Sequence, residues 1–557
     1  MRDPMNHPPP APGRVSGNLV DPLARTIRPA TLTIEAGRIA AIHDDAAPHA
    51  TFLLPGFVDA HVHVESSLLP PSEFARMAVV HGTVATVSDP HEIANVLGIP
   101  GVDFMLDDAH GVPFKFHFGA PSCVPATAFD HAGATIDATG VAAMLDRPEI
   151  GYLSEMMNYP GVVAGDPEVL AKIAASRQRG KPVDGHAPRL RGPALAAYVA
   201  AGISTDHECV DRDEALEKIG LGMHVLIREG SAARNFDALC SLIDEHPDRC
   251  MLCSDDKHPD QLLTGHIDAL VRRALARGSD LFDVLRVATV NPVRHYGLPV
   301  GLLQPGDPAD FIEVDDLHGL RVRRTIIDGR QVSADGMPLW PQRKADTPNR
   351  FTTRPKTADD FTIRATAADH GRMVHVIGAL DGQLVTESLR RPASVHEGRL
   401  RSDPAADVLT IAVVDRYDDR PPALGLVANF GLGTSAIASS VAHDSHNIVA
   451  VGGSESAIAR AVNLLIDCRG GLAAVGQGRE AVLPLPIAGL MSDRPGIEVA
   501  AGYAAVTRLA REFGSRLDSP FMTLAFMSLL VIPALKLAPM GPFDVERFAP
   551  VDLFVRG

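Results

Sequence analysis

Two histidines separated by a single residue, His61 and His63, follow a short apolar run that begins after the turn pair Pro55-Gly56. In an extended chain, residues i and i+2 point to the same side of the backbone, so the two imidazoles can meet at one point. Imidazole nitrogens bind zinc, iron, copper and nickel, and a pair at this spacing supplies half of a common metal site. A strand that carries two histidines by chance is the competing interpretation, and the pair alone does not decide between them.

Four further residues of metal-ligand type stand at the ends of other short apolar segments. They are Glu155 after residues 150–154, His186 after residues 182–185, His207 after residues 203–206, and Asp255 after residues 250–254. Four histidines and two carboxylates can hold two divalent ions, because two carboxylates and a hydroxide offset three of the four positive charges. The sequence therefore predicts a two-metal site.

Strands and helices alternate from residue 56 to about residue 301. A helix predicted over residues 72–81 ends at Gly82 and is followed by a strand over residues 83–87. Asp166 and Pro167 are residue types favoured at a helix start, and Gly180 is typical of a helix end. About 245 residues of this repetition match the size of a (β/α)₈ TIM-like barrel, whose chemistry lies at the C-terminal ends of its strands. Such a barrel would bring the six ligands to one mouth.

The segments on either side of the barrel predict two further domains. Hairpin signals at Ala36-Gly37 and Asp328-Gly329 indicate that residues 1–55 and 302–340 form one small β-sandwich domain into which the barrel (residues 56–301) is inserted. A proline-containing linker then leads to a C-terminal α/β domain over residues 341–557. The overall class is therefore α/β.

Composition excludes several kinds of partner. The 557 residues carry a net charge of −16, which argues against nucleic acid as a partner because that role needs a basic surface. Six scattered cysteines indicate a reducing compartment, and the lone pair Cys250 and Cys253 reads as part of a strand. No secretory signal and no membrane-spanning segment is predicted. We expect a soluble, cytoplasmic protein.

Several stretches resemble the adenine deaminases, a metal-dependent family within the amidohydrolase superfamily. The stretches in the first half of the chain are residues 55–67, 89–98, 121–127, 155–162, 184–188, 206–209, 228–235, 254–259 and 288–292. Residues 441–452 and 483–492 are similar to the C-terminal part of the family, which most other hydrolases of the superfamily lack. The resemblance extends from about residue 30 to the end of the chain.

The resemblance implies a role for each strand-end residue. His61 and His63 would bind one metal, His186 and His207 the other, and Glu155 would bridge the two; Asp255 would bind the first metal and take a proton from the bridging water, a role for which Asp256 competes. It also implies adenine as the small-molecule substrate, hypoxanthine and ammonia as products, and a place in purine salvage or catabolism. The metals would be two divalent ions, Mn²⁺ or Fe²⁺ ahead of Zn²⁺, since a mixed nitrogen and oxygen ligand set suits all three.

The chemistry itself needs further groups. Displacing ammonia from C6 requires hydroxide at neutral pH, and a metal can lower the pKa of water from ~15.7 to about 7. Protonation of the neighbouring ring nitrogen calls for a general acid, for which Glu208, Glu92 and His91 are candidates. Glu92 is equally well explained as a carboxylate in the first turn of a helix. Asp184 and Asp206 precede ligand histidines and are better interpreted as supporting groups.

Two clusters are candidates for substrate contact. Arg228, Glu229 and Ser231 follow a predicted strand over residues 225–227, although a salt-bridged loop is the alternative for the first two. His443 and Asp444 belong to a dense polar turn that either caps the barrel mouth or is a buried hydrogen-bonded turn.

Alternative functions use the same ligands. A binding protein that had lost catalysis would be expected to lack some of the six, and all six are present. A related hydrolase acting on another aminopurine or a cyclic amide would not need the C-terminal third. Arg189 and Arg191 stand where the family more often has small residues, which bears on the pocket rim. A homo-oligomer is compatible with the sequence, which does not specify one.

Overall fold

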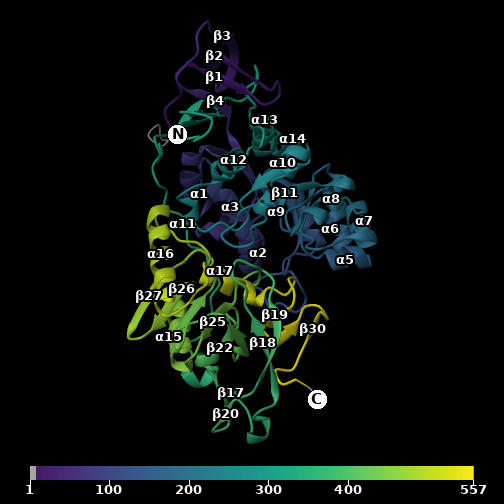
Figure 1. The fold of residues 1–557 in the computed structure, drawn as a ribbon, viewed down its shortest axis with the longest axis vertical. Helices are drawn as coiled ribbons and strands as arrows, with labels where there is room; N and C mark the ends of the chain where they lie inside the picture. Colours follow the sequence, from purple (N-terminus) through teal and green to yellow (C-terminus); the bar gives the residue numbers. More distant parts are fainter. Residues whose placement is uncertain (1–7, 556–557) are drawn as a thin grey trace.

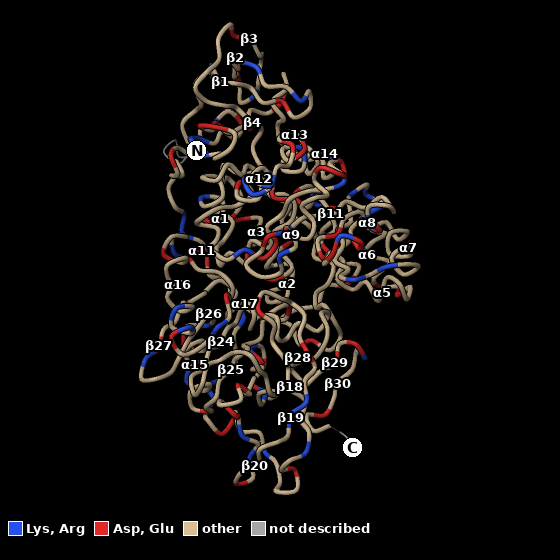
Figure 2. The backbone as a smooth tube through the Cα atoms, viewed as in Figure 1, with Lys and Arg blue, Asp and Glu red and all other residues tan. Residues whose placement is uncertain are grey.

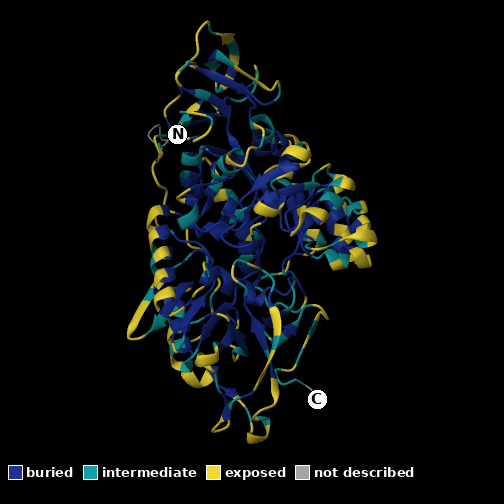
Figure 3. Ribbon diagram, viewed as in Figure 1, coloured by how far each residue is buried: buried dark blue, intermediate teal, exposed yellow. Residues whose placement is uncertain are grey.

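The computed structural model describes residues 8–555 as three packed parts. In Figure 1 a curled sheet from the start of the chain lies at the top, a strand-and-helix body lies in the middle, and the C-terminal region lies below it. Figure 3 shows that the buried residues run continuously from the body into the C-terminal region. One apolar core accordingly joins residues of both, from Val58 in the body to Leu537 near the end of the chain.

The first part is one eight-stranded sheet built from both flanks of the body. Its order is β16-β15-β14-β13-β4-β1-β2-β3, with β4 antiparallel to β13. The expected sandwich takes the form of this continuous sheet, which curls until its turns meet: Ala309 N donates to Gly37 O (2.9 Å) and Gly329 N to Ala309 O (3.1 Å). Its strands are β1 (Arg14–Asp21), β2 (Thr26–Glu35), β3 (Arg38–Asp44), β4 (Phe52–Pro55), β13 (Phe311–Val314), β14 (Val322–Ile327), β15 (Arg330–Ala334) and β16 (Met337–Pro338).

The middle part contains eight successive parallel strands in two curled sheets, ordered β5-β6-β7-β8-β9 and β10-β11-β12. A parallel bridge between Val62 and Asp255 brings the end of the first strand beside the end of the last. The carboxyl ends of the strands therefore face one region. The strands are β5 (Phe57–Val62), β6 (Thr83–Ser88), β7 (Lys115–Ala120), β8 (Ile150–Met156), β9 (Val183–Gly185), β10 (Thr205–Asp206), β11 (His224–Arg228) and β12 (Cys250–Cys253).

Helices connect these strands, and their ends follow from local sequence. Asp166 caps α6 by accepting from Glu168 N (2.9 Å) and Val169 N (3.1 Å), and Pro167 is the first helical residue, as predicted. The helices are α1 (Pro71–Ala78), α2 (His91–Leu97), α3 (Ile99–Ala109), α4 (Ala138–Leu145), α5 (Tyr159–Ala164), α6 (Pro167–Gln178), α7 (Gly192–Ala200), α8 (Arg212–Gly220), α9 (Phe236–Leu239), α10 (Leu242–Glu245), α11 (Pro259–Leu262), α12 (Ile267–Ala276), α13 (Leu281–Leu285) and α14 (Asn291–Tyr296).

The C-terminal region is organised around an eight-stranded mixed sheet, β19-β18-β23-β22-β25-β24-β26-β27. Its strands are β18 (Met373–Gly378), β19 (Glu387–Pro392), β22 (Val408–Val414), β23 (Ala423–Ala428), β24 (Ala436–Ser439), β25 (Ile448–Gly452), β26 (Gly471–Gly476) and β27 (Arg479–Pro484). Two small sheets add β17 (Ile363–Arg364), β20 (Val395–His396) and β21 (Arg399–Leu400), and β28 (Leu535–Ala538), β29 (Gly541–Asp544) and β30 (Ala549–Pro550). The helices are α15 (Glu455–Cys468), α16 (Gly496–Glu512) and α17 (Pro520–Ala525).

The C-terminal region is fixed to the body by specific contacts. Glu73 of α1 accepts a hydrogen bond from Gly496 N at the start of α16 (2.8 Å).

Lysines and arginines are dispersed among acidic residues throughout the chain in Figure 2 rather than gathered into one stripe. Within residues 8–555, no helix has the length and apolar character needed to span a bilayer.

Candidate metal centre and active site

The imidazoles of His61 and His63 converge at the end of the first strand of the body. His61 lies in β5 and His63 directly follows it, and their Nε2 atoms are 3.1 Å apart. His63 Nδ1 lies 3.2 Å from the backbone oxygen of Asp89, which fixes the ring orientation. The predicted convergence of the i and i+2 imidazoles is therefore seen in the structure.

Glu155, near the end of β8, lies between this pair and a second pair of histidines. Its Oε1 is 3.3 Å from His63 Nε2. Its Oε2 is 2.7 Å from His186 Nδ1 and 3.1 Å from His207 Nε2. The two oxygens of one carboxylate thus face two different ligand groups, which is the arrangement that a bridging ligand requires.

Asp255 and Asp256 follow β12 and face different neighbours. Asp255 Oδ1 is 3.5 Å from His61 Nε2 and 3.3 Å from His63 Nε2. Asp256 Oδ1 instead lies 2.6 Å from the hydroxyl oxygen of Ser66. The backbone of Asp255 has a φ of 53°, a conformation that turns the chain between the two aspartates. Asp255 is therefore the better placed of the two beside the first histidine pair.

The six residues suit divalent ions. All are at least 94% buried, so their charges are poorly solvated. Burial favours the protonated acid, yet His186 and His207 hold the pKa of Glu155 well below its usual range. Burial likewise opposes ionisation of Asp255, whose pKa Arg228 and the His61 imidazole hold well below its ordinary value. Converging imidazole nitrogens and ionised carboxylates form the mixed donor set that Mn²⁺, Fe²⁺ and Zn²⁺ accept.

Neighbouring polar groups hold the strand ends in place. Asp59 accepts from Ser254 N (2.9 Å) and lies 2.8 Å from His266 Nε2, which ties β5 to the segment after β12. Asp206 accepts from Ala187 N (2.9 Å) and Glu208 N (2.8 Å), and thereby joins the loops that carry His186 and His207. Asp184 accepts from Thr205 Oγ1 (2.9 Å) and Tyr296 OH (2.9 Å). These contacts agree with the supporting role predicted for Asp184 and Asp206.

Arg228, the last residue of β11, is held by two carboxylates of the site. Its guanidinium pairs with both oxygens of Glu208 and donates to Asp255 Oδ2 (2.7 Å). Burial lowers its pKa, but Glu208 and Asp255 outweigh burial and raise the pKa above the ordinary value of 12.5. Glu208 Oε1 is also 3.5 Å from His186 Nδ1 and from His207 Nε2. Glu208 and Arg228 thus form one charged network with His186, His207 and Asp255.

The other two residues predicted for substrate contact in this loop have structural partners. The carboxylate of Glu229 pairs with Arg273 of α12 (2.6 Å) and is not brought to the ligand cluster. Arg228 and Glu229 both form salt bridges, as the predicted alternative of a salt-bridged loop has it. They do not pair with each other: Arg228 pairs with Glu208 and Asp255, and Glu229 pairs with Arg273. Ser231 Oγ accepts from His258 N (2.8 Å) and so orders the segment after Asp256.

The C-terminal region contributes side chains to the site. His443 Nδ1 is 3.3 Å from Glu92 Oε1, and Asp444 Oδ1 is 3.7 Å from His91 Nε2. His91 Nδ1 in turn is 3.6 Å from Glu155 Oε1. Burial is the largest influence on His443 and lowers its pKa, yet Glu92 and neighbouring carboxylates raise it to about 9. The turn is buried, as one predicted alternative has it, and its side chains lie beside His91 and Glu92 of the strand-end cluster.

Sequence reasoning did not single out two residues of this cluster. Ser66 Oγ lies between Asp256 Oδ1 and Glu92 Oε1, at 2.6 Å and 3.1 Å. Glu65 is buried, and its burial together with the charge of Glu92 raises its pKa to about 8. Both lie within residues 55–67, but only the packing of α2 against this segment shows their contacts.

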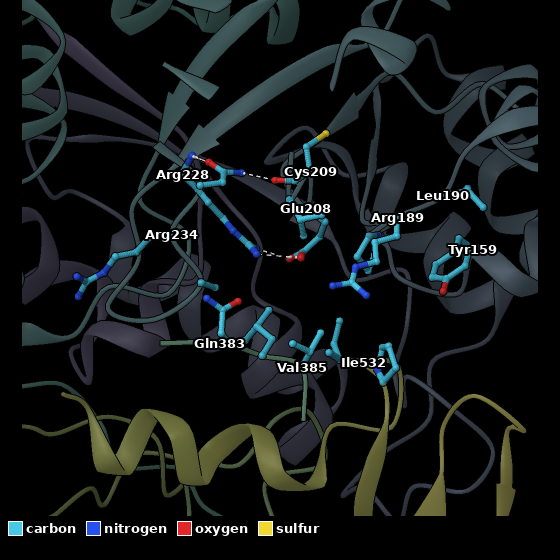
Figure 4. A pocket seen from close by; sticks show the side chains of 16 residues that line it. Tyr159, Arg189, Leu190, Glu208, Cys209, Arg228, Arg234, Gln383, Val385 and Ile532 are labelled. Carbon is cyan, nitrogen blue, oxygen red and sulfur yellow. Dashed lines mark hydrogen bonds and ion pairs between the residues drawn. The ribbon is translucent and has the colours of Figure 1, made fainter. Parts of the chain in front are cut away.

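A cavity of about 390 Å³ opens beside the charged network. Figure 4 shows Glu208 and Arg228 on one side of it and Val385 and Ile532 from the C-terminal region on the other. Arg189 extends into the space between them in this view.

Comparison of the sequence with known proteins shows which family the chain belongs to. Residues 52–332 match the amidohydrolase family, and residues 383–549 match the adenine deaminase C-terminal domain. Adenine deaminase of Salinibacter ruber is 56% identical over 548 residues, which cover 98% of this chain and 100% of that protein. Those of a Sulfurovum species and of Methanosarcina acetivorans are 55% and 51% identical, each over 97% of this chain and 99% of the relative.

The chain belongs to the adenine deaminase family. The six clustered ligands all fall within the part that matches the amidohydrolase family, whereas His443, Asp444 and Val385 fall within the part that matches the C-terminal domain of adenine deaminases. Residues from both matched parts therefore contribute to the site.

Proposed function

We propose that the protein hydrolyses adenine to hypoxanthine and ammonia with two divalent ions held at the strand ends. The observation that carries this proposal is the placement of Glu155, whose two carboxylate oxygens face the two histidine pairs. Membership of the adenine deaminase family supports the substrate. The eight parallel strands and the bridge from Val62 to Asp255 support a closed (β/α)₈ barrel as the frame of the site.

The ligands divide into two sets. His61, His63 and Asp255 would hold one ion, His186 and His207 the other, and Glu155 both. When bound, ions of this kind lower the pKa of water to about 7 and so supply hydroxide at neutral pH. Mn²⁺ and Fe²⁺ are the ions we propose first, with Zn²⁺ also suited to the donors.

Proton transfer falls to the carboxylates of the chain. Hydrolysis adds the oxygen of water to C6, and the two protons of that water end on ring nitrogen N1 and on the departing amino group. Asp255 lies beside His61 and His63, where it can accept one proton and return it to the amino group. Glu208 faces the cavity and both His186 and His207, where it can move the second proton to N1.

The ion pair with Arg228 refines the role predicted for Glu208. Because Arg228 pairs with both oxygens of the Glu208 carboxylate, Glu208 would act as a carrier that accepts a proton and then donates it to N1. Glu92 and His91 are the alternative donors. They lie on the far side of Glu155, beside His443 and Asp444, and we assign this group to ordering the purine and closing the mouth.

Activity and metal content test the proposal together. The metal-free protein is loaded with Mn²⁺, Fe²⁺ or Zn²⁺, and metal per chain, ammonia release and hypoxanthine are measured with adenine. Two ions per chain and equal amounts of ammonia and hypoxanthine are expected. Hydantoin and dihydroorotate serve as controls for the alternative hydrolase, and turnover of one of them or of another aminopurine without turnover of adenine would refute the substrate assignment.

A further inference from the structure

The cavity beside Glu208 lies next to the ligand cluster, and it is separated from the six ligands by the side chains of Glu208 and Arg228. Glu208 and Arg228 form its inner side, and these two residues contact His186, His207 and Asp255. Its volume of about 390 Å³ falls in the range of ~300–1,000 Å³ found for small-molecule sites. The ligands themselves are no more than 6% exposed, so a substrate needs a passage to them.

We infer that this cavity is the passage through which a planar purine base enters and leaves the centre, and that Arg189 at its rim governs that traffic. The inference rests on the proposed function for the identity of the base. Arg189 is exposed, and Figure 4 shows its guanidinium extending into the cavity. Within residues 8–555, the structure records neither an ion pair nor a hydrogen bond of this guanidinium, so it is available to a ligand.

The backbone holds Arg189 at the rim while its side chain stays available. Its N–H donates to Glu214 Oε1 (2.9 Å), and its φ of 58° turns the loop after His186. A free guanidinium is planar and stacks on aromatic faces, so it can lie against the face of a purine as the base passes. The guanidinium at the rim can therefore contact a flat aromatic base.

The backbone of the opposite wall is held by hydrogen bonds within the C-terminal region, whereas the guanidinium of Arg189 has no such partner among the described residues. Lys536 Nζ donates to the backbone oxygens of Leu384 (2.8 Å) and Phe526 (2.9 Å). Thr386 N donates to Pro533 O (3.0 Å) and Thr386 Oγ1 to Leu535 O (2.8 Å), so the two wall segments are joined. A backbone hydrogen bond from Ala233 N to Gly382 O (3.2 Å) and the packing of Ala232 with Ile532 join this wall to the body.

A second cavity offers the competing route. It has a volume of about 550 Å³ and is lined by residues of the loop 122–137, by Met156 and by residues of α6. None of the six ligands lines it, and its contact with the centre is indirect, through Ser122 Oγ and the backbone oxygen of Glu155 (2.5 Å). None of the six ligands lines the first cavity either, but its Glu208 and Arg228 contact the side chains of His186, His207 and Asp255. The first cavity is therefore the more direct route.

Blocking each cavity in turn distinguishes the two. The variants are R189W and V385W for the first cavity and A128W, at an exposed residue of the second, as the matched control. The metal-loaded protein is mixed with o-phenanthroline, a flat, neutral aromatic chelator, and the rate of metal removal is followed. Both first-cavity variants should slow removal and lower kcat/KM for adenine by about tenfold, because the passage is obstructed; the control should change neither by more than about twofold.

Each outcome decides the question. Fast metal removal from R189W together with slow removal from A128W would overturn the inference. R189A separates obstruction from stacking: it should leave chelator access unimpeded, raise KM for adenine and leave kcat unchanged. Because Arg189 is exposed, R189W carries the test if V385W does not fold. If R189W loses metal slowly and the wild-type protein does not turn over adenine, the passage is upheld and the proposed substrate is refuted. The failure of the inference and the failure of the proposed function are therefore distinguishable.

Discussion

Lys536 is a fully buried amine whose charge should depend on pH near neutrality. Its Nζ has two backbone carbonyls as partners, and no carboxylate among the described residues pairs with it. Burial lowers the pKa of Lys536 from 10.5 to about 7. Between these two values the folded chain holds the amine neutral while the unfolded chain holds it protonated.

The sign of the pH dependence follows from proton uptake. Unfolding binds a proton in this window, so the contribution of Lys536 to stability rises with pH between about 7 and 10.5 and is constant outside it. At ~1.36 kcal/mol per pH unit the whole window amounts to about 5 kcal/mol, and the interval from pH 7.5 to 9.0 to about 2 kcal/mol. Below pH 7 the charged amine is most costly to bury.

The substitution K536M isolates this contribution, because it keeps the length of the side chain and removes its titration. The free energy of unfolding of both proteins is measured in urea at several pH values between 7.5 and 9.0. Loss of the two hydrogen bonds adds a difference that is constant with pH, so only the slope tests the reasoning. The wild-type protein should gain about 2 kcal/mol relative to K536M over this interval.

A matched control is K344M, since Lys344 is exposed and its variant should show no slope relative to wild type. A difference between wild type and K536M that stays flat with pH would refute the reasoning. It would mean that the carbonyls of Leu384 and Phe526 stabilise the ammonium enough to offset its burial.

The remaining predictions concern the site. E155Q should lose bound metal as well as activity, because a neutral amide bridges two dications poorly; full metal occupancy in this variant would place the bridge elsewhere. E208Q should keep both ions and slow turnover by about 10²–10⁴-fold, whereas D255N should also lose metal; near-normal turnover of E208Q would move the proton donor to Glu92 or His91. R228M should destabilise the chain by about 3–5 kcal/mol, since it removes the buried guanidinium that Glu208 and Asp255 share, and an unchanged urea midpoint would contradict that cost.

The clustering of four histidines and two carboxylates could be predicted because each of these residues stands at a strand end, and a strand end is visible as the point where a short apolar run stops. His186 and Glu155 were found in this way although about 30 residues separate them. Residue types alone do not show which of Asp255 and Asp256 faces the first histidine pair, because this depends on the backbone turn at Asp255. The contact between Glu92 and His443 joins residues more than 300 positions apart, and periodicity carries no information on such pairs.

Other parts of the fold were hidden for a different reason. The strand β1 contains glycine and asparagine and shows no clean alternation, so only its pairing with β2 and β4 makes it a strand. The small β domain was expected from its hairpins, yet a hairpin signal specifies a local turn and not whether eight strands form two sheets or one. Glu229 was placed by its sequence neighbours, and the salt bridge to Arg273 that holds it depends on the position of α12.

The pairing of β4 with β13 has a consequence for how the chain is made. Pro55 lies opposite Phe311, so the two strands are about 255 residues apart in synthesis. At ~5–20 residues per second a ribosome needs roughly 13–50 s to cover that distance. During this interval the nascent chain carries β4 with one edge unpaired, and unpaired strand edges are the sites at which chains associate wrongly. Translation speed through the middle of the message therefore sets how long this strand edge stays without its partner.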